Sequence, residues 1–170
     1  MNAFWLLDRL CIVIPVAAGF VRIGNLMNHE IIGKITDVSW AFDFTRGGYT
    51  SLGETIAGTL RHPTQLYEAV VYLLLFLFMV IYYFRFTREH VPPGRMTGIL
   101  LFVIFTARFF IEFYKEVQVE KEGAMVLDIG QWLSIPFVII GLGLIVYSCI
   151  KKDVIPHYFE PENLIKKEQK

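Results

Sequence analysis

The sequence predicts an all-α integral membrane protein with about four transmembrane helices and an outward-facing irregular loop. Of the 170 residues, 55% are hydrophobic and only 19% are charged, and the mean hydropathy is +0.50. Apolar runs recur along the chain, and each is long enough to cross a bilayer, which takes about 20 apolar residues in a helix. The predicted spans are residues 10–28, 66–86, 96–114 and 129–150.

Each span has its own signature. The first follows MNAFWLLDRL, where Asp8 and Arg9 interrupt the apolar pattern, so this start is unlike a cleavable signal peptide. The second has no charged residue between Glu68 and Arg85, and the third holds charges in its last half. The fourth contains Pro136 and a pair of glycines, which membrane helices tolerate and which indicate a kink or close packing. These glycines are Gly141 and Gly143.

Positive charge predicts the orientation. The link between the second and third spans carries Arg85, Arg88 and Arg95, whereas the basic residues of the loop at 29–65 are accompanied by acids. The positive-inside rule places this link and the C-terminus in the cytoplasm and the longer loops outside. We therefore divide the chain into a transmembrane part, 1–150, and a cytoplasmic polar tail, 151–170. The loop at 33–60 is rich in Gly, Thr and Ser and is the part that could form short strands.

The composition also excludes some functions. The formal net charge is +0, so no overall basic field favours nucleic acid. The two cysteines, Cys11 and Cys149, lie in separate apolar runs, which argues against a disulfide and against a CxxC metal site. We expect neither a metal nor a cofactor.

The stretch GFVRIGNLMNHEIIG ends the first span with unusual polarity. Arg22, Asn25 and His29 lie on one helical stripe, with Asn28 at its margin, and the helix is predicted to break near Asn28. Ionisable groups at membrane depth usually face the protein interior and mark function. A guanidinium suits phosphate because its planar fork donates two hydrogen bonds. The alternative is that Arg22 extends to the headgroups without a specific role.

A second polar stretch, RHPTQLYE, precedes the second span. Pro63 suits the first turn of a helix, which leaves Arg61 and His62 before the helix and places Gln65 and Glu68 in its opening turns. The alternative is an ordinary helix start with interfacial charges.

A third polar stretch, ARFFIEFYKE, ends the third span. Arg108 and Glu112 share a helical face, and Lys115 follows one turn later. The alternative is an intramembrane ion pair between Arg108 and Glu112 that satisfies itself. Because the predicted topology brings Arg22 and Arg108 toward the same leaflet, the two together suit an anionic lipid headgroup.

These stretches resemble the bacterial prolipoprotein diacylglyceryl transferases. The family signature is roughly Gly-Arg-x-Gly-Asn-x-x-Asn-x-Glu-x-x-Gly, and RHPTQLYE, ARFFIEFYKE and DIGQWLSIP are similar to further blocks in the same order. The signature is matched by Arg22, Gly24, Asn25, Asn28, Glu30 and Gly33. The family transfers the diacylglyceryl group of phosphatidylglycerol to the lipobox cysteine thiol of prolipoproteins, leaving a thioether and releasing glycerol phosphate. The resemblance thus implies lipoprotein maturation in the bacterial inner (cytoplasmic) membrane.

The resemblance also implies roles for residues. Arg22 would contact the lipid phosphate, and the nucleophilic thiol would belong to the prolipoprotein signal peptide. The catalytic candidates are Arg108, Glu30, Asn25, Asn28 and His62. The supporting candidates are Gly24, Gly33, Arg61, Gln65, Tyr67, Glu68 and Glu112. Phosphatidylglycerol, prolipoprotein signal peptides and membrane lipid are the implied partners.

The sequence also departs from the family pattern. Family members are usually longer by several N-terminal helices that include a His-Gly-Gly block, so we expect this chain to be a C-terminal portion that is inactive alone. Ile104 stands where the family tends to have tyrosine, His29 where it has a small residue, and Lys115 where it favours arginine. Two alternatives remain. One is a non-catalytic or degenerate membrane fragment that binds anionic lipid, and the other is a small transporter or channel, for which the inverted repeats of such proteins are not found.

Overall fold

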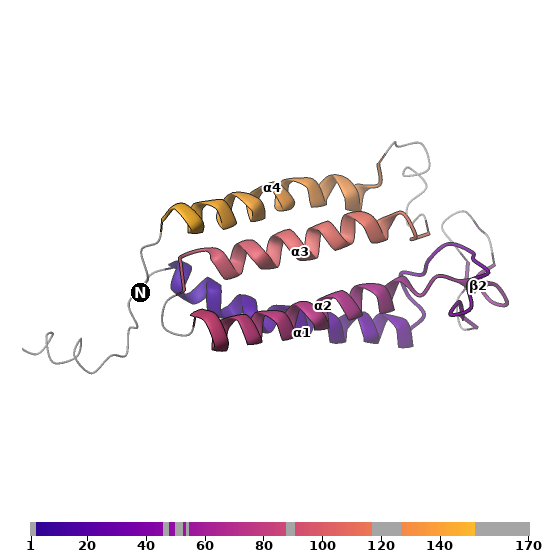
Figure 1. Cartoon of the computed structure of the whole chain (residues 1–170). Coiled ribbons are helices and arrows are strands. Elements are labelled where there is room, and N and C mark those ends of the chain that lie inside the picture. The colour runs from indigo at the N-terminus through magenta and orange to yellow at the C-terminus, as the bar shows by residue number, and fades with distance from the viewer. Residues whose placement is uncertain are drawn as a thin grey trace, which may run out of the picture.

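The computed structural model describes residues 3–45, 48–49, 53, 55–87, 91–116 and 127–151. Its helices are long and lie side by side (Figure 1). They are α1 (Ala3–Met27), α2 (Thr64–Tyr82), α3 (Arg95–Glu112) and α4 (Ile129–Ile150), with a π-helical turn, η1 (Tyr83–Thr87), after α2. Two short strands, β1 (Phe42–Asp43) and β2 (Leu60–Arg61), form an antiparallel pair. This mostly helical architecture confirms the predicted fold class.

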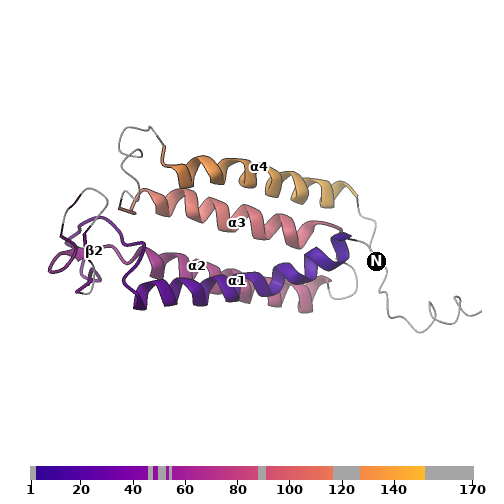
Figure 2. The same ribbon diagram turned by 180° about the vertical axis from the view of Figure 1, so that it is seen from behind.

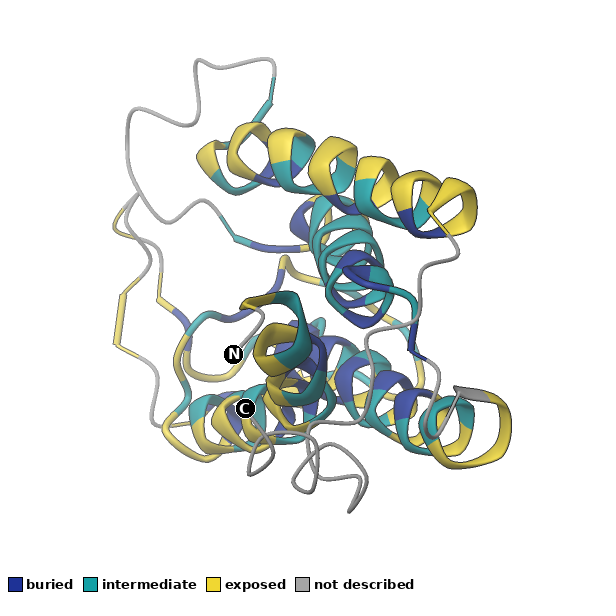
Figure 3. Ribbon diagram, turned by 90° about the vertical axis from the view of Figure 1, so that its left-hand side faces the viewer, coloured by how far each residue is buried: buried dark blue, intermediate teal, exposed yellow. Residues whose placement is uncertain are grey.

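Three of these helical segments are long and apolar enough to cross a membrane. They are α1, the segment Thr64–Phe86 formed by α2 and η1, and α4, with mean hydropathies of 1.9, 2.2 and 2.3. The third predicted span is the helix α3, which lies beside them but carries Arg95, Arg108 and Glu112. Exposed residues lie on the outward faces of the helices (Figure 3), and many of them are large and apolar, as suits a surface that faces lipid. The chain is therefore an integral membrane protein.

The first helix begins at Ala3 rather than at residue 10, because Asp8 and Arg9 are accommodated within it. Asp8 is 1% exposed, and its carboxylate accepts hydrogen bonds from the N–H groups of Gly94 (2.7 Å) and Thr97 (2.9 Å). Gly94 is the N-cap of α3 and has no side chain to satisfy the free N–H groups there, so Asp8 of α1 performs this function. Arg9 lies over the ring of Trp5 at 4.0 Å.

The helices pack as two pairs, α1 with α2 and α3 with α4 (Figures 1 and 2). In the second pair the backbones approach closely at Gly98 and Gly141: a Cβ atom on Gly141 would lie 2.6 Å from the backbone nitrogen of Phe102. This confirms close packing at Gly141. A Cβ atom on Gly143, by contrast, would meet nothing within 4 Å, so the second glycine takes no part in the contact.

The loop between α1 and α2 lies beyond the ends of these helices, at the end of the bundle where α3 ends and α4 begins (Figure 1). As predicted, it forms short strands. A small core of Leu26, Ile32, Phe44 and Ile56 holds it together. The predicted cytoplasmic tail lies outside the described residues, apart from Lys151.

The first turn of α2 is tied to this loop. Pro63 was expected in the first turn of the helix. It is instead the N-cap residue, and α2 begins at Thr64. The Thr64 hydroxyl donates to the carbonyl of Ile31 at 3.1 Å, and the Gln65 amide donates to the carbonyl of Glu30 at 2.5 Å. These two contacts fix the end of the signature stretch against the start of α2.

Candidate functional site

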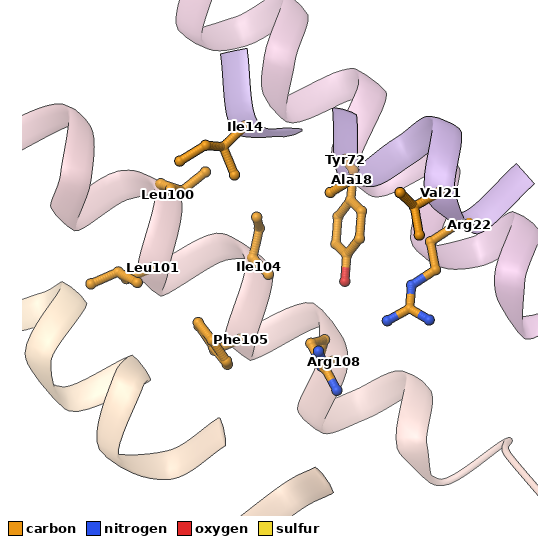
Figure 4. Close-up of a pocket in the computed structure, with 10 residues that line it drawn as sticks. All are labelled: Ile14, Ala18, Val21, Arg22, Tyr72, Leu100, Leu101, Ile104, Phe105 and Arg108. Atoms are coloured by element: carbon orange, nitrogen blue, oxygen red, sulfur yellow. The ribbon is translucent and has the colours of Figure 1, made fainter. Parts of the chain in front are cut away.

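A cavity of about 500 Å³ lies between α1, α2 and α3. Most of its wall is apolar, and its polar groups are Arg22 of α1, Tyr72 of α2 and Arg108 of α3 (Figure 4). The apolar lining consists of Ile14, Ala18, Val21, Leu100, Leu101, Ile104 and Phe105. An apolar cavity with a few convergent polar groups is the usual form of a ligand site.

Arg22 is held toward the interior of the protein. Its Nε lies 2.7 Å from Oε2 of Glu68, whose side chain is fully buried, while the Arg22 side chain is 14% exposed. Because this contact uses Nε, the two terminal nitrogens of Arg22 remain directed toward the cavity (Figure 4). The alternative in which Arg22 merely extends to the headgroups does not fit this inward ion pair.

Glu68 belongs to a larger buried charge cluster. Lys115 places its Nζ 3.1 Å from Oε1 of Glu68 and 2.9 Å from Oε2 of Glu112. Lys115 is 4% exposed and Glu112 is also buried. Two cations, Arg22 and Lys115, thus balance two carboxylates, as buried charges require.

Arg108 is outside this balance. Within the described part of the chain it makes no hydrogen bond and no ion pair, and its Nε is buried without a partner. The alternative, an ion pair between Arg108 and Glu112, is wrong, because Glu112 contacts Lys115 instead. Arg108 as a whole is half-buried, and a charge withdrawn from water without a counter-charge is costly unless something pairs with it. The cavity therefore presents one uncompensated positive charge, and its chemistry suits an anion.

Tyr72 is the residue of this site that the sequence analysis missed. Its side chain is 3% exposed, and its hydroxyl points between the guanidinium groups of Arg22 and Arg108 (Figure 4), with which it interacts electrostatically. One signal could have revealed it, since Tyr72 follows Glu68 by four residues and so shares its helical face. Ile104, where the family tends to have tyrosine, lines the same cavity.

The remaining signature residues lie outside the lining of this cavity. Asn28 and Glu30 are exposed, and Asn25 is half-buried. The helix breaks after Met27, as predicted near Asn28, so His29 leaves the predicted stripe. Its backbone φ is 58° and its ring packs edge-on against Phe44 at 5.5 Å.

His62 and Tyr67 form a polar contact at the start of α2. Nδ1 of His62 lies 3.0 Å from the Tyr67 hydroxyl, which also accepts a hydrogen bond from the Trp40 indole at 2.8 Å. The indole can only donate, so the hydroxyl proton is available to the imidazole. This arrangement holds the His62 ring at the loop end of the bundle, apart from the cavity lining.

Gly33 and Arg61 join the loop to the end of α3. A Cβ atom on Gly33 would lie 2.3 Å from the carbonyl oxygen of His62, so only glycine fits there. Arg61 is fully buried, and its guanidinium donates to the carbonyl of Gly33 at 3.3 Å and to the carboxylate of Glu116 at 2.6 Å. The other signature glycine, Gly24, has open space around it.

The fold and the cavity together define a class of protein: a helical membrane protein with an apolar cavity whose lining includes an arginine without a counter-charge among the described residues. Comparison with known sequences is more specific. The sequence model of the prolipoprotein diacylglyceryl transferase family matches residues 1–147, and the chain belongs to this family.

Curated relatives are similar over most of the chain. The phosphatidylglycerol–prolipoprotein diacylglyceryl transferase of Bacteroides fragilis is 47% identical over 154 residues, which cover 91% of this chain and 52% of that protein. The proteins of the same name from Chloroherpeton thalassium and Porphyromonas gingivalis are 42% and 39% identical, over 87% and 85% of this chain and 51% and 53% of theirs. The chain thus spans about half the length of the curated relatives it matches.

Proposed function

We propose that this chain takes part in transferring the diacylglyceryl group of phosphatidylglycerol to the lipobox cysteine of prolipoproteins. The observation that carries the proposal is the uncompensated guanidinium of Arg108, which faces Arg22 across an apolar cavity. A phospholipid has the matching chemistry, because it joins an anionic phosphate to apolar chains. Membership of the family and the names of the relatives support the same function.

The reaction forms one bond and breaks another. The thiolate sulfur of the lipobox cysteine bonds to the glycerol carbon that carries the phosphate of the lipid, and the C–O bond to that phosphate breaks. The electron pair of this bond leaves with the phosphate oxygen as glycerol phosphate, and the thiol proton passes to a base. The departing phosphate gains negative charge as the C–O bond breaks, so fixed cations beside it stabilise the transition state.

Arg108 and the terminal nitrogens of Arg22 are placed to hold that phosphate. The apolar lining that continues from them, including Ile14 and Leu101, suits the diacylglyceryl part of the lipid. We assign Asn25, Asn28, Glu30 and His62 to the loop end of the site, where a prolipoprotein signal peptide would arrive. They lie at the polar end of the bundle, where the side chains of Asn28 and Glu30 are exposed.

We further propose that the chain is a multi-pass protein of the bacterial cytoplasmic membrane with its C-terminus in the cytoplasm. The apolar helices support membrane insertion. The arginine-rich link after α2 and the loop between α1 and α2 lie at opposite ends of the bundle, so they belong on opposite sides of the membrane. The positive-inside rule assigns the link to the cytoplasm.

The direct test is a transfer assay in phosphatidylglycerol vesicles with a fluorescent lipobox peptide. It would use the chain itself and a chimera that joins it to the part of the Bacteroides fragilis relative with which it does not align. We expect the chimera to form the thioether-linked product and the chain alone to form none. Binding of phosphatidylglycerol by the chimera without transfer would instead support an anionic-lipid-binding protein.

A further inference from the structure

We propose that Lys115 is a positioning residue that keeps Arg108 available by holding Glu112 away from it. The inference rests on the proposed function for its purpose, since the anion that Arg108 awaits is the lipid phosphate. The structure shows no ion pair between Arg108 and Glu112, and Glu112 pairs with Lys115 instead.

Arg108 and Glu112 would be expected to pair with each other. They lie four residues apart on α3, the spacing at which side chains of opposite charge meet on a helix. In a buried site the attraction between such charges is stronger than in water. Yet these two side chains form no ion pair, and Arg108 is left without a counter-charge among the described residues.

The partner that replaces Arg108 is Lys115. Its Nζ contacts two carboxylates at once: it lies 2.9 Å from Oε2 of Glu112 and 3.1 Å from Oε1 of Glu68. Lys115 thus bridges carboxylates from α2 and α3. Lys115 is the partner of Glu112, and it shares Glu68 with Arg22, so neither carboxylate pairs with Arg108.

The backbone around Lys115 fixes this arrangement. Lys115 forms an isolated bridge with Gly33, and the N–H of the next residue, Glu116, donates to the carbonyl of Ile32 at 3.1 Å. The Glu112 carboxyl is also packed closely against Gly130, where a Cβ atom would lie only 2.7 Å from its carboxyl carbon. The loop and the start of α4 therefore hold both members of the Lys115–Glu112 pair.

Removal of Lys115 leaves Glu112 unpaired beside an unpaired Arg108. The least costly rearrangement is for the two to pair, because an isolated buried charge is strongly disfavoured. Arg22 would continue to satisfy Glu68. The cavity would then lose its uncompensated positive charge, and with it the basis for binding a phosphate.

The test reads the pairing of Arg108 directly. The chain in phosphatidylcholine nanodiscs is treated with phenylglyoxal, which modifies unpaired arginines, and the rate at Arg108 is followed by peptide mass spectrometry relative to the exposed Arg85. We expect Lys115→Met to slow modification of Arg108 by at least roughly tenfold, because opening a buried ion pair is costly. The double variant Glu112→Gln with Lys115→Met should restore the rate, and Lys115→Arg should retain it.

Two results would overturn the proposal. One is an unchanged Arg108 rate in Lys115→Met, and the other is a rate that stays slow in the double variant, since a purely structural loss would not be rescued by neutralising Glu112. Thermal unfolding of each variant shows that the folded protein is being compared. Because this readout needs no transfer, failure of the chimera to transfer lipid would contradict the proposed function and leave the pairing result separate.

Discussion

Glu68 of α2 contacts Arg22 of α1 through Nε, at 2.7 Å, and so occupies the arginine without covering its terminal nitrogens. A bidentate carboxylate would have used the same fork that a phosphate requires. The contact therefore positions Arg22 while leaving its fork facing Arg108 and Tyr72. The terminal nitrogens of Arg22 thus remain free for the phosphate that we propose for this cavity.

The hydroxyl of Tyr72 should contribute to transfer. Tyr72→Phe keeps the buried ring and removes the only O–H group that lies between the two guanidinium groups in the cavity lining. Loss of a hydrogen bond to a charged group costs about 1.5–3 kcal/mol, so we expect transfer by the chimera to fall roughly tenfold to a hundredfold. Initial rates in phosphatidylglycerol vesicles give the measurement.

Tyr82→Phe is the matched control for this variant. Tyr82 also lies on α2, and its hydroxyl accepts a hydrogen bond from Arg95 at 3.3 Å, but it is not among the residues that line the cavity. We expect Tyr82→Phe to retain the parental transfer rate. Equal rates for both variants would show that the Tyr72 hydroxyl has no role in the reaction.

Gly33 should be intolerant of any side chain. In Gly33→Ala the new Cβ would lie 2.3 Å from the His62 carbonyl oxygen and 2.6 Å from the His62 Cβ atom, so the backbone must shift. Overpacking of this kind costs about 1–3 kcal/mol. Gly24→Ala, which meets nothing within 4 Å and lies inside α1, should not lower the unfolding midpoint in detergent. If the two variants unfold at the same temperature, the close approach at Gly33 is not needed.

Asp8 should stabilise the fold from outside the site. Asp8→Ala removes the acceptor for the N–H groups of Gly94 and Thr97 at the start of α3. Leaving such buried donors unsatisfied costs about 1–3 kcal/mol, so we expect a lower unfolding midpoint. The exposed Asp37 provides the comparison, because Asp37→Ala removes a carboxylate without a hydrogen bond in the described structure. A midpoint unchanged by Asp8→Ala would contradict the capping role.

The predicted orientation can be tested by cysteine labelling. In a background with Cys11 and Cys149 replaced by serine, Gly48→Cys on the exposed loop should react with a membrane-impermeant maleimide in intact cells. Arg85→Cys, at the opposite end of the bundle, should react only after permeabilisation. The reverse pattern would place the C-terminus outside.

Periodicity and local signals predicted where the helices of this fold lie, but they did not predict the contacts between those helices. The apolar runs located the helices, and the signature stretch located the break near Asn28, because both depend on residues close in sequence. The burial of Asp8 could not be predicted, since its partners at Gly94 and Thr97 are brought to it only by packing of α1 against α3. For this reason the predicted span begins at residue 10, after Asp8, whereas α1 begins at Ala3 and contains Asp8.

The candidate site shows the same limit. Arg22 and Arg108 were identified as a pair facing one leaflet, and the structure brings both into one cavity. The choice of partners was missed, because helix spacing alone favours Glu112 for Arg108, whereas the fold brings Lys115 to Glu112 and Glu68. Tyr72 was missed because an aromatic residue in an apolar run carries no signal of what lies opposite.

The central claim is that Arg22 and Arg108 together hold the lipid phosphate. A lysine keeps the charge but lacks the planar fork, so the two residue types are not interchangeable at such a site. Loss of one donor to a transition-state anion typically costs on the order of 10²–10³ in rate. The exposed Arg85, on the link after α2, offers a control for charge and membrane insertion.

The most direct measurement is the transfer rate of the chimera with Arg108→Lys, with Arg22→Lys and Arg85→Lys measured in parallel at equal membrane abundance. The account predicts that Arg108→Lys and Arg22→Lys each lose transfer by a factor on the order of 10²–10³, while Arg85→Lys transfers at the parental rate. Near-parental transfer by Arg108→Lys would contradict the claim that this guanidinium binds the phosphate.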